Sequence, residues 1–158
     1  MEKFKAGECD LVTTDGSGLV GNRAKEGALN DWAIFPASPI SKEPLGPVYR
    51  SNDSQWADIV NWTVYATFIA DEYGVGRANV DSFDYDANPE MGRLMGKNDG
   101  ELQTVMGLSA DAFYNVIKQV GNYDEIYSKN LNPVGLYREG SANAPWTEGG
   151  LIYAPPAR

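Results

Sequence analysis

The longest regular pattern of hydrophobic positions runs over residues 54–73. Its positions recur every three or four residues, which places them along one face of a helix, and further apolar residues widen that face. The face is defined by Trp56, Ile59, Val60, Thr63, Val64, Thr67 and Phe68, and it is widened by Trp62, Tyr65 and Ile69. Residues 51–54 offer N-cap side chains before it, and Gly74 and Gly76 end it. The pattern predicts a long helix that is buried on more than one side.

Weaker patterns in the rest of the second part of the chain predict three short helices, over residues 88–95, 110–120 and 123–130. We expect Ser109 to cap the second of these helices and Gly121 to end it. Residues 77–106 are otherwise polar and irregular. Residues 131–158 are rich in glycine and proline, and we expect them to wrap the surface as an extended tail.

The first 36 residues alternate between helix-like and strand-like patterns. They predict the end of a helix stopped by Gly7, a strand over 9–14, a helix over 17–26 and a strand over 32–35 that Pro36 ends. Residues 37–48 contain three prolines and form a stiff connection, which leads into a short strand over 48–50. This alternation places the chain in the α/β class, with a boundary at the proline-rich segment. Because the chain opens on the last turn of a helix, we expect a further segment before it.

Composition narrows the possible functions. At 158 residues, with 42% hydrophobic residues, the chain suits one domain or two halves of a split one. Thirteen basic residues against 22 acidic ones give a net charge of −9, which repels phosphate backbones and anionic membrane surfaces. We therefore expect no nucleic-acid partner. The most apolar run, residues 59–70, is too short to span a bilayer, and the first residues lack the apolar core of a signal peptide.

The chain has no histidine and one cysteine. This excludes Ser-His and Cys-His nucleophilic catalysis and removes the commonest metal ligands, so we expect neither a metal ion nor a cofactor. Residues 84–88 have the alternating oxygen side chains of a calcium loop, but Pro89 and Met95 stand where that loop needs glycine and glutamate, which predicts a solvated loop. Cys9 is interpreted either as a small buried hydrophobic residue or as half of a disulfide whose partner lies outside this chain.

Asp15 is the strongest candidate for a binding residue. It follows a predicted strand and precedes the glycine-rich turn 16–21, so it is predicted to lie at the carboxyl edge of a sheet, where open α/β folds bind their ligands. A single carboxylate at that edge suits a small cationic group such as an amine. The position is also that of a helix N-cap. Asp15 therefore either caps its own helix or pairs with the ammonium group of a ligand.

Residues 16–21 match the pattern Gly-x-Gly-x-x-Gly, which is typical of dinucleotide-binding turns. Against that function, Asp15 would face a pyrophosphate with like charge, and the acid near residues 30–31 precedes the next strand instead of ending it. A tight strand-to-helix turn capped by Ser17 is the simpler interpretation. A nucleotide-binding enzyme that uses turn 16–21 is kept as an alternative.

Six stretches of the chain form a recognisable set: residues 13–19, 40–47, 55–60, 62–66, 117–123 and 146–156. They resemble the polar amino-acid-binding family of bacterial ABC importers, and above all its general L-amino-acid-binding proteins. They occur in the family's order along nearly all 158 residues. They correspond to about the last half of a family member.

The resemblance implies a two-lobed α/β fold, the type II periplasmic-binding-protein fold, that closes on an amino acid by a hinge. Residues 1–38 would be the end of lobe 2, residues 39–48 the returning hinge strand, and residues 49–158 the C-terminal part of lobe 1. The function implied is that of the ligand-binding component of an amino-acid ABC importer, which is periplasmic and not an enzyme. Its partners would be an L-amino acid, the membrane permease and the N-terminal half of the same protein.

Specific residues receive roles from the same resemblance. Asp15 stands where the family places the carboxylate that receives the ligand's α-ammonium group, and Thr14 beside it would contribute a hydroxyl. Cys9 stands where this subfamily has a cysteine that pairs with one upstream. The groups that hold the ligand's α-carboxylate lie in the family's first half, and no residue here is assigned that role.

One alternative belongs to a different class from the transporter and the nucleotide-binding enzyme. A standalone α/β interaction domain would self-associate through the open edges of its sheet. A stable dimer of the isolated chain would favour this alternative, whereas binding of an L-amino acid would favour the transporter.

Overall fold

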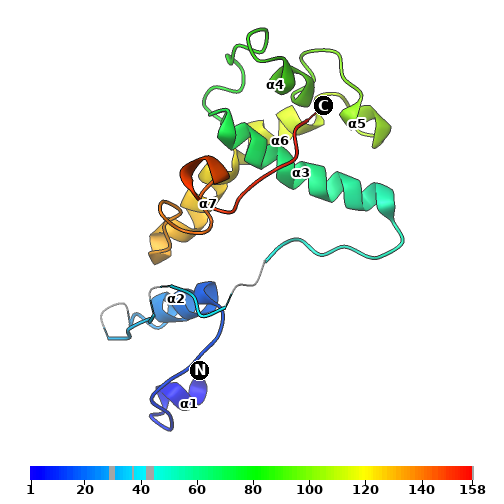
Figure 1. Cartoon of the computed structure of the whole chain (residues 1–158). Coiled ribbons are helices and arrows are strands. Elements are labelled where there is room, and N and C mark those ends of the chain that lie inside the picture. The colour runs from blue at the N-terminus through cyan, green and yellow to red at the C-terminus, as the bar shows by residue number, and fades with distance from the viewer. Residues whose placement is uncertain (29–30, 37, 42–44, 158) are drawn as a thin grey trace. The chain divides into compact units, whose positions relative to one another are not determined.

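The computed structural model describes residues 1–28, 31–36, 38–41 and 45–157 (Figure 1). The chain divides into two units by its internal contacts. The first unit comprises Met1–Leu45 with Pro133–Leu136, and the second comprises Gly46–Asn132 with Tyr137–Arg158. The expected assignment of residues 1–38, 39–48 and 49–158 to lobe 2, hinge and lobe 1 stays a prediction. Part of the predicted hinge, residues 42–44, lies outside the described residues.

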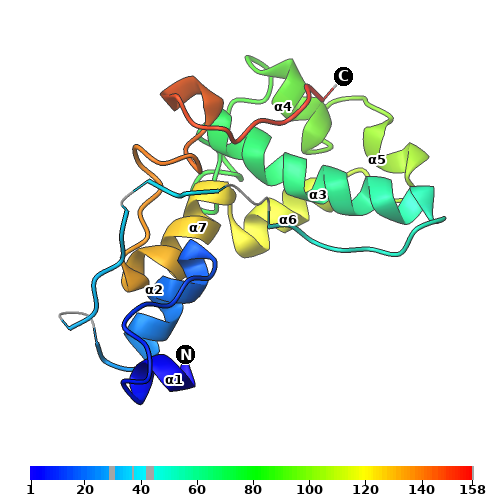
Figure 2. The same ribbon diagram turned by 60° about the horizontal axis from the view of Figure 1, so that its bottom comes forward.

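The second unit is built around the long helix α3 (Ser54–Glu72), which confirms the helix predicted over 54–73 (Figure 2). Its N-cap is Asp53, whose carboxylate accepts a hydrogen bond from Trp56 N at 2.9 Å. Helices α6 (Ala112–Val120) and α7 (Tyr123–Leu131) pack against α3. Helix α4 (Pro89–Leu94) contacts α5 (Leu102–Val105), a helix in a region where the sequence predicted irregular chain apart from 88–95.

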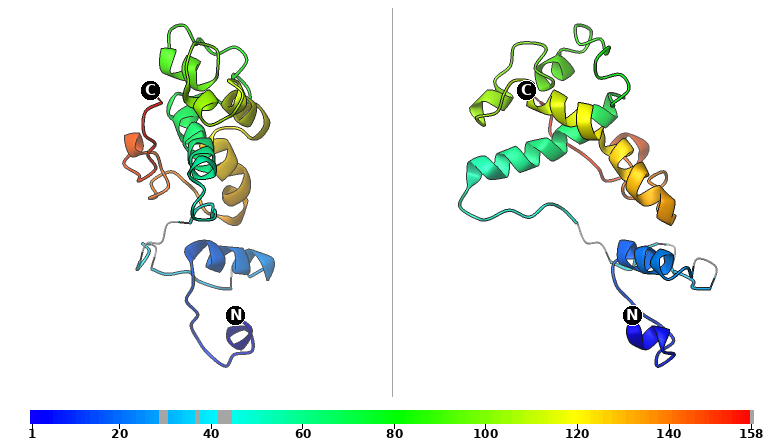
Figure 3. Two further views of the ribbon diagram at one scale, coloured as in Figure 1. Left: turned by 90° about the vertical axis from the view of Figure 1, so that its right-hand side faces the viewer. Right: turned by 180° about the vertical axis from the view of Figure 1, so that it is seen from behind.

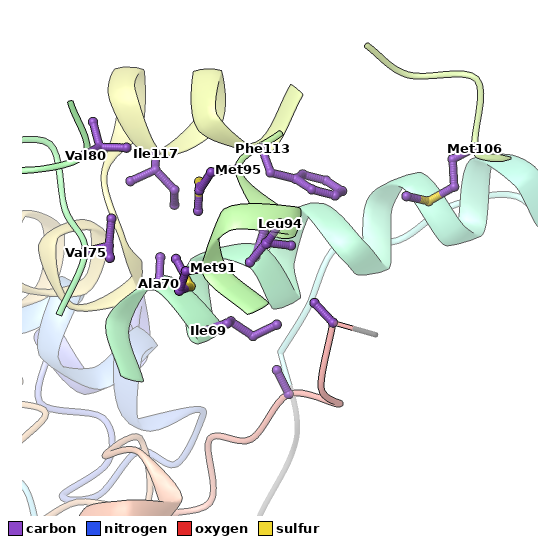
Figure 4. Close-up of a cluster of buried hydrophobic side chains, with 13 residues drawn as sticks. Ile69, Ala70, Val75, Val80, Met91, Leu94, Met95, Met106, Phe113 and Ile117 are labelled. Carbon is purple, nitrogen blue, oxygen red and sulfur yellow. The ribbon is translucent and has the colours of Figure 1, made fainter. Parts of the chain in front are cut away.

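The core of the second unit collects side chains from α3, α4, α6 and the segments between them (Figure 4). Its largest fully buried members are Phe113, Met91, Leu94, Met95 and Ile117. Burying a side chain of this size contributes about 1.5–3 kcal/mol relative to leaving it exposed. The second half of α3 lies in this core, since residues 66, 67, 69 and 70 are buried.

The first half of α3 is much less covered than its apolar sequence predicts. Trp56 is 51% exposed, and residues 57–65 are partly or fully exposed. In the views of Figures 1 and 3 this half of α3 extends beyond α6 and α7. Ile59, Trp62 and Tyr65 still pack against the core on one side. The prediction of a helix buried on more than one side therefore holds only for its second half.

The turn between α6 and α7 is held in place by a glycine and by a set of hydrogen bonds. Gly121 adopts a φ of 92°, which ends α6 as predicted. Asn122 and Glu125 form a reciprocal capping box at the start of α7. Asn122 Nδ2 also donates to Val75 O at 3.0 Å, and the Glu125 carboxylate accepts from Arg77 N at 3.1 Å. These bonds join the α6–α7 turn to the chain that follows α3.

The C-terminal residues are part of this unit and not a loose tail. They include the short 3-10 helix η2 (Trp146–Glu148). The 3-10 helix η1 (Asn132–Val134) precedes them at the point where the chain passes from the second unit to residues of the first. Ala154 and Ala157 are buried in the core, and Ala157 N donates to Glu90 Oε1 on α4 at 2.9 Å. The predicted surface tail therefore holds for most of residues 131–157, which are exposed or half-buried, but not for these alanines, whose small side chains let the segment pack closely against α3 and α4.

Within its described residues the first unit contains two α-helices, α1 (Glu2–Lys5) and α2 (Gly16–Lys25). The α2 helix confirms the one predicted over 17–26. Lys5 pairs with Glu2 in its own helix at 3.0 Å, and it links α1 to the end of α2 through an ion pair with Glu26 at 3.1 Å. Phe4 packs edge-on against Trp32, with their ring centroids 5.1 Å apart.

The three predicted strands are absent from the residues that the structure describes. Residues 9–14, 32–35 and 48–50 run as irregular chain (Figure 1). A strand needs backbone hydrogen bonds to a neighbouring extended segment, and within the described ranges the one β-type pairing is an isolated bridge between Pro145 and Ile152. The strand-like side chains stay exposed as a result, at 69% for Leu11, 70% for Phe35 and 96% for Val48. The α/β assignment is therefore not confirmed.

Three smaller expectations were also wrong. Asp111 is the N-cap of α6 in place of Ser109, and Ser17 lies inside α2 and does not cap it. Cys9 is exposed, because its segment finds no sheet to be buried in, and this contradicts its interpretation as a buried hydrophobic residue. Among the described residues, no helix combines the length and the apolar character needed to cross a membrane.

Candidate functional site

Asp15 stands at the N-cap position of α2, with a φ of −52° and a ψ of 143°. Its backbone carbonyl accepts the first helical hydrogen bond from Leu19 N at 2.9 Å, but its carboxylate makes no capping hydrogen bond. The residue is exposed, and no ion pair found within the described part of the chain includes it. Of the two roles left open for Asp15, side-chain capping is therefore not used in this structure.

Thr14 lies directly before Asp15 and is also exposed. It contacts the first turn of α2 at Gly18, where an added Cβ would lie 3.3 Å from Thr14 Cγ2 and 3.7 Å from Thr14 Oγ1. That spacing is tighter than ordinary contact, so the absence of a side chain at Gly18 lets Thr14 approach the helix. Within turn 16–21 this close approach is specific to Gly18, since an added Cβ at Gly16 or Gly21 would have nothing within 4 Å. The structural interpretation of the turn, which needs small residues, therefore holds at Gly18.

A hydroxyl and a carboxylate therefore stand next to each other in sequence at the start of α2. Both groups accept hydrogen bonds, and an ammonium group carries three donors that match them. The roles of Asp15 and Thr14 toward a ligand stay predictions.

No metal centre is apparent in the described ranges: no three acidic or cysteine side chains gather closely enough there to hold an ion. The calcium-like residues 84–88 instead form a local turn. Asp84 Oδ1 accepts from Ala87 N at 3.0 Å, and Asn88 Nδ2 donates to Asp84 O at 2.9 Å. These bonds hold residues 84–88 as a local turn, which agrees with the predicted solvated loop.

A second feature lies in the second unit and was not identified from the sequence. It is a hollow of about 180 Å³ between the end of α3, the start of α4, η2 and the C-terminal segment, which we call the aromatic hollow. Its lining consists of aromatic, proline and acidic residues with two small aliphatic ones: Tyr73, Trp146, Tyr153, Pro155, Pro156, Glu72, Glu90, Ile69 and Ala154. The aromatic and proline density of residues 146–156 was the signal that could have located it.

Both carboxylates of the aromatic hollow accept hydrogen bonds from its aromatic side chains. Trp146 Nε1 donates to Glu72 Oε1, and the Tyr73 hydroxyl donates to Glu90 Oε2, each at 3.0 Å. Burial raises the pKa of the Glu72 carboxyl above its usual value, the hydrogen bond from Trp146 opposes this, and the charges of Asp71 and Glu90 raise it further. Negative charge is therefore concentrated here.

We expect the indole N–H resonance of Trp146 to titrate with the Glu72 carboxyl, at a midpoint above the ordinary value of 4.5. Above that pH the indole donates to a carboxylate, and below it to a neutral carboxyl that accepts a weaker bond. An NMR pH titration measures the midpoint, with Trp146→Phe to identify the resonance. Glu72→Gln should remove the titration, and a midpoint at or below 4.5 would contradict the raised pKa.

Comparison with known proteins identifies curated relatives over nearly the whole chain. The general L-amino acid-binding periplasmic protein AapJ of Rhizobium johnstonii is 45% identical over 159 residues, which cover 98% of this chain and 46% of AapJ. The glutamate/glutamine/aspartate/asparagine-binding protein BztA of Rhodobacter capsulatus is also 45% identical, over 100% of this chain and 47% of BztA. The putative amino-acid ABC transporter-binding protein YhdW of Escherichia coli K12 is 40% identical.

The chain spans about half the length of these curated relatives, and it matches roughly their C-terminal half. One solved structure agrees: an ABC transporter periplasmic binding protein from Brucella ovis with glutathione bound. It has a TM-score of 0.91 and 40% identity, over 99% of this chain and 49% of that chain. Protein-family models give no match. The relatives are solute-binding proteins, which supports the transporter prediction and not the nucleotide-binding or self-association alternatives.

Proposed function

We propose that this chain, homologous along nearly its whole length to periplasmic amino-acid-binding proteins of ABC transporters, forms part of the ligand-binding component of such a transporter. It would act in the periplasm and deliver an L-amino acid to a membrane permease. The proposed mechanism is capture without covalent chemistry. Support comes from the 40–45% identity to proteins named for amino-acid binding and from the TM-score of 0.91 to a periplasmic binding protein.

In this proposal Asp15 receives the α-ammonium group of the amino acid, and Thr14 adds a hydroxyl acceptor. The observation that carries it is the free carboxylate of Asp15: it stands at the N-cap of α2 yet makes no capping bond and no ion pair among the described residues. A carboxylate in that position is available to a cation from outside the chain. A ligand ammonium desolvated between two lobes would form a charge-assisted hydrogen bond with it.

The proposal also requires polypeptide beyond these two units. We assign residues 1–38 to the end of lobe 2, residues 39–48 to the hinge strand and residues 49–158 to the C-terminal part of lobe 1 of a two-lobed protein. The exposed first half of α3 and the unpaired segments 9–14, 32–35 and 48–50 support this, because they leave apolar side chains and backbone groups uncovered. The complementary half of the protein would supply strands to these segments and the groups that hold the ligand's α-carboxylate.

We expect Asp15→Asn to weaken binding of L-amino acids at least about thirtyfold in a chimera where this chain replaces the segment of AapJ that it matches. Deleting one partner of a desolvated charge pair costs roughly 2–5 kcal/mol, and 1.4 kcal/mol is a factor of ten. Isothermal titration calorimetry with individual L-amino acids measures the loss. A second measurement tests the ligand's amine directly, because 2-oxoglutarate lacks the amino group of L-glutamate. The chimera should bind L-glutamate more tightly than 2-oxoglutarate, and Asp15→Asn should reduce that difference in affinity.

Asp10→Asn is the matched control, since Asp10 is an exposed acid in the same irregular segment. It should leave the affinity unchanged. Equal affinity of the Asp15→Asn and unmodified chimeras would refute the role of Asp15. A chimera that folds, as judged by circular dichroism, but binds no amino acid would refute the proposed function of the chain.

A further inference from the structure

The aromatic hollow presents exposed aromatic rings beside carboxylates, and the proposed amino-acid capture does not use it. Trp146 is 53% exposed and Tyr153 is 58% exposed. Their rings meet edge to face, with centroids 6.1 Å apart. The bond from Trp146 Nε1 to Glu72 fixes the orientation of the indole, so its ring is held in place on the surface.

The hollow has a charge that is not neutralised within the described part of the second unit. No basic side chain there lies within 4.0 Å of Glu72 or Glu90, whereas nearby Asp71 is paired with Arg138 at 2.6 Å. The bonds to Trp146 and Tyr73 use one oxygen of each carboxylate, and Ala157 N uses the other oxygen of Glu90. Each oxygen accepts more than one hydrogen bond, so both carboxylates keep capacity for a cation.

A guanidinium group matches this arrangement of groups. It is planar, it stacks on aromatic faces, and its fork of donors binds carboxylates. A compact ammonium would use the charge but not the flat aromatic faces. The volume of about 180 Å³ is below the 300–1,000 Å³ typical of pockets that enclose small molecules, so the hollow fits one side-chain head group carried on a larger partner.

We propose that the aromatic hollow is a docking surface for an arginine side chain presented by a protein partner. The complementary charge of Glu72 and Glu90 selects the cation, and the rings of Trp146 and Tyr153 with the neighbouring prolines select its flat shape. The chain's net charge of −9 adds a long-range attraction for a basic partner. This inference does not depend on the role of Asp15, since every residue it uses lies in the second unit.

The test uses the full chain and a capped pentapeptide with one central arginine between serine and glycine residues, against the same peptide with citrulline. Citrulline keeps the shape of arginine and removes its charge. We expect the arginine peptide to shift the Trp146 indole resonance saturably in the millimolar range, with a weaker response at high salt. The citrulline peptide should bind at least about tenfold more weakly than the arginine peptide, which corresponds to 1.4 kcal/mol.

Two variants complete the test. Glu72→Gln with Glu90→Gln should weaken binding of the arginine peptide about tenfold. The amide oxygens can still accept from Trp146 Nε1 and Ala157 N, and the amide nitrogen at position 90 can donate to the Tyr73 hydroxyl, so the fold is preserved. Glu101→Gln, an exposed acid outside the hollow, should have no effect. Equal binding of the two peptides, or no saturable shift, would overturn the proposal. Free guanidinium ion binding as tightly as the peptide would also overturn it, because the site would then be one for small cations.

Discussion

Arg138→Met is expected to lower the free energy of unfolding of the second unit by about 3–5 kcal/mol. Arg138 is only 7% exposed. Its Nη1 lies 2.6 Å from Asp71 Oδ2 on α3 and 3.3 Å from Asp124 Oδ1 on α7, and its Nε donates to Asn143 O at 2.7 Å. Its guanidinium also lies 4.8 Å from the centroid of the Tyr123 ring. One side chain therefore joins the C-terminal segment to two helices, and its loss leaves the Asp71 carboxylate buried without a cation.

The pH dependence of this loss has a definite sign. Burial raises the pKa of the Asp71 carboxyl, and Arg138 opposes that rise, so removing Arg138 raises the pKa further. A carboxyl with a raised folded-state pKa gains stability as the pH falls through that pKa. Urea unfolding followed by tryptophan fluorescence should therefore show a smaller deficit for Arg138→Met at pH 5 than at pH 7. A constant deficit would assign the loss to packing alone.

Two control variants separate the charge from the size of the side chain. Arg77→Met removes an exposed arginine whose recorded contacts use only its backbone, and it should change stability by less than about 0.5 kcal/mol. Asp71→Asn combined with Arg138→Met should recover part of the loss, since no buried charge then remains unpaired. If the double variant is as unstable as the sum of the two single variants, the ion pair is not the cause.

Gly96→Ala is expected to destabilise the second unit by about 2–5 kcal/mol, and Gly74→Ala by only about 1–2 kcal/mol. Both glycines follow a helix, α4 and α3 respectively, and both have a φ of 65°. An added Cβ at Gly74 has nothing within 4 Å, but at Gly96 it would overlap the carbonyl oxygen of Ala110 and lie 2.5 Å from its carbon. The backbone strain is therefore shared, and the clash is specific to Gly96.

Thermal and urea unfolding of the two variants measure the difference directly. The close approach at Gly96 brings the end of α4 against the backbone just before α6, so relieving the clash requires one of these segments to move. A loss at Gly96 that exceeds the loss at Gly74 by at least about 1 kcal/mol is the expected result. Equal losses would show that φ alone explains why glycine is needed at both positions.

Helices were predicted from the sequence with good agreement, and strands were not. The helices over 54–73, 110–120 and 123–130 carry a repeating apolar face, and a glycine directly follows the first two, which are local signals. A strand is defined by a second chain segment beside it. The alternation in residues 9–14 and 32–35 is genuine, but the described residues contain no partner for it, so a local pattern could not decide the outcome.

Burial was harder to predict than helix position. Val48 reads as a strand residue and is 96% exposed, whereas the C-terminal alanines read as a tail and are in the core. The α5 helix is only four residues long and has too short an apolar pattern to be recognised. In each case the result depends on what lies beside the segment in space, which neighbouring residues in sequence do not encode.

In the candidate sites, too, the features set by local sequence were predicted and those set by tertiary packing were not. The position of Asp15 at the start of α2 was predicted, because a glycine-rich turn before a helix is a local feature. The family resemblance is likewise confirmed by relatives at 40–45% identity. The aromatic hollow was not predicted, because Glu72, Glu90 and Trp146 come from three distant parts of the chain and meet only through tertiary packing.

The buried positions of Ala154 and Ala157 also limit where a protease can trim the chain without harm. These alanines close one side of the core that α3, α4 and α6 share. Cleavage before residue 154 would uncover that side and expose apolar surface, which favours aggregation.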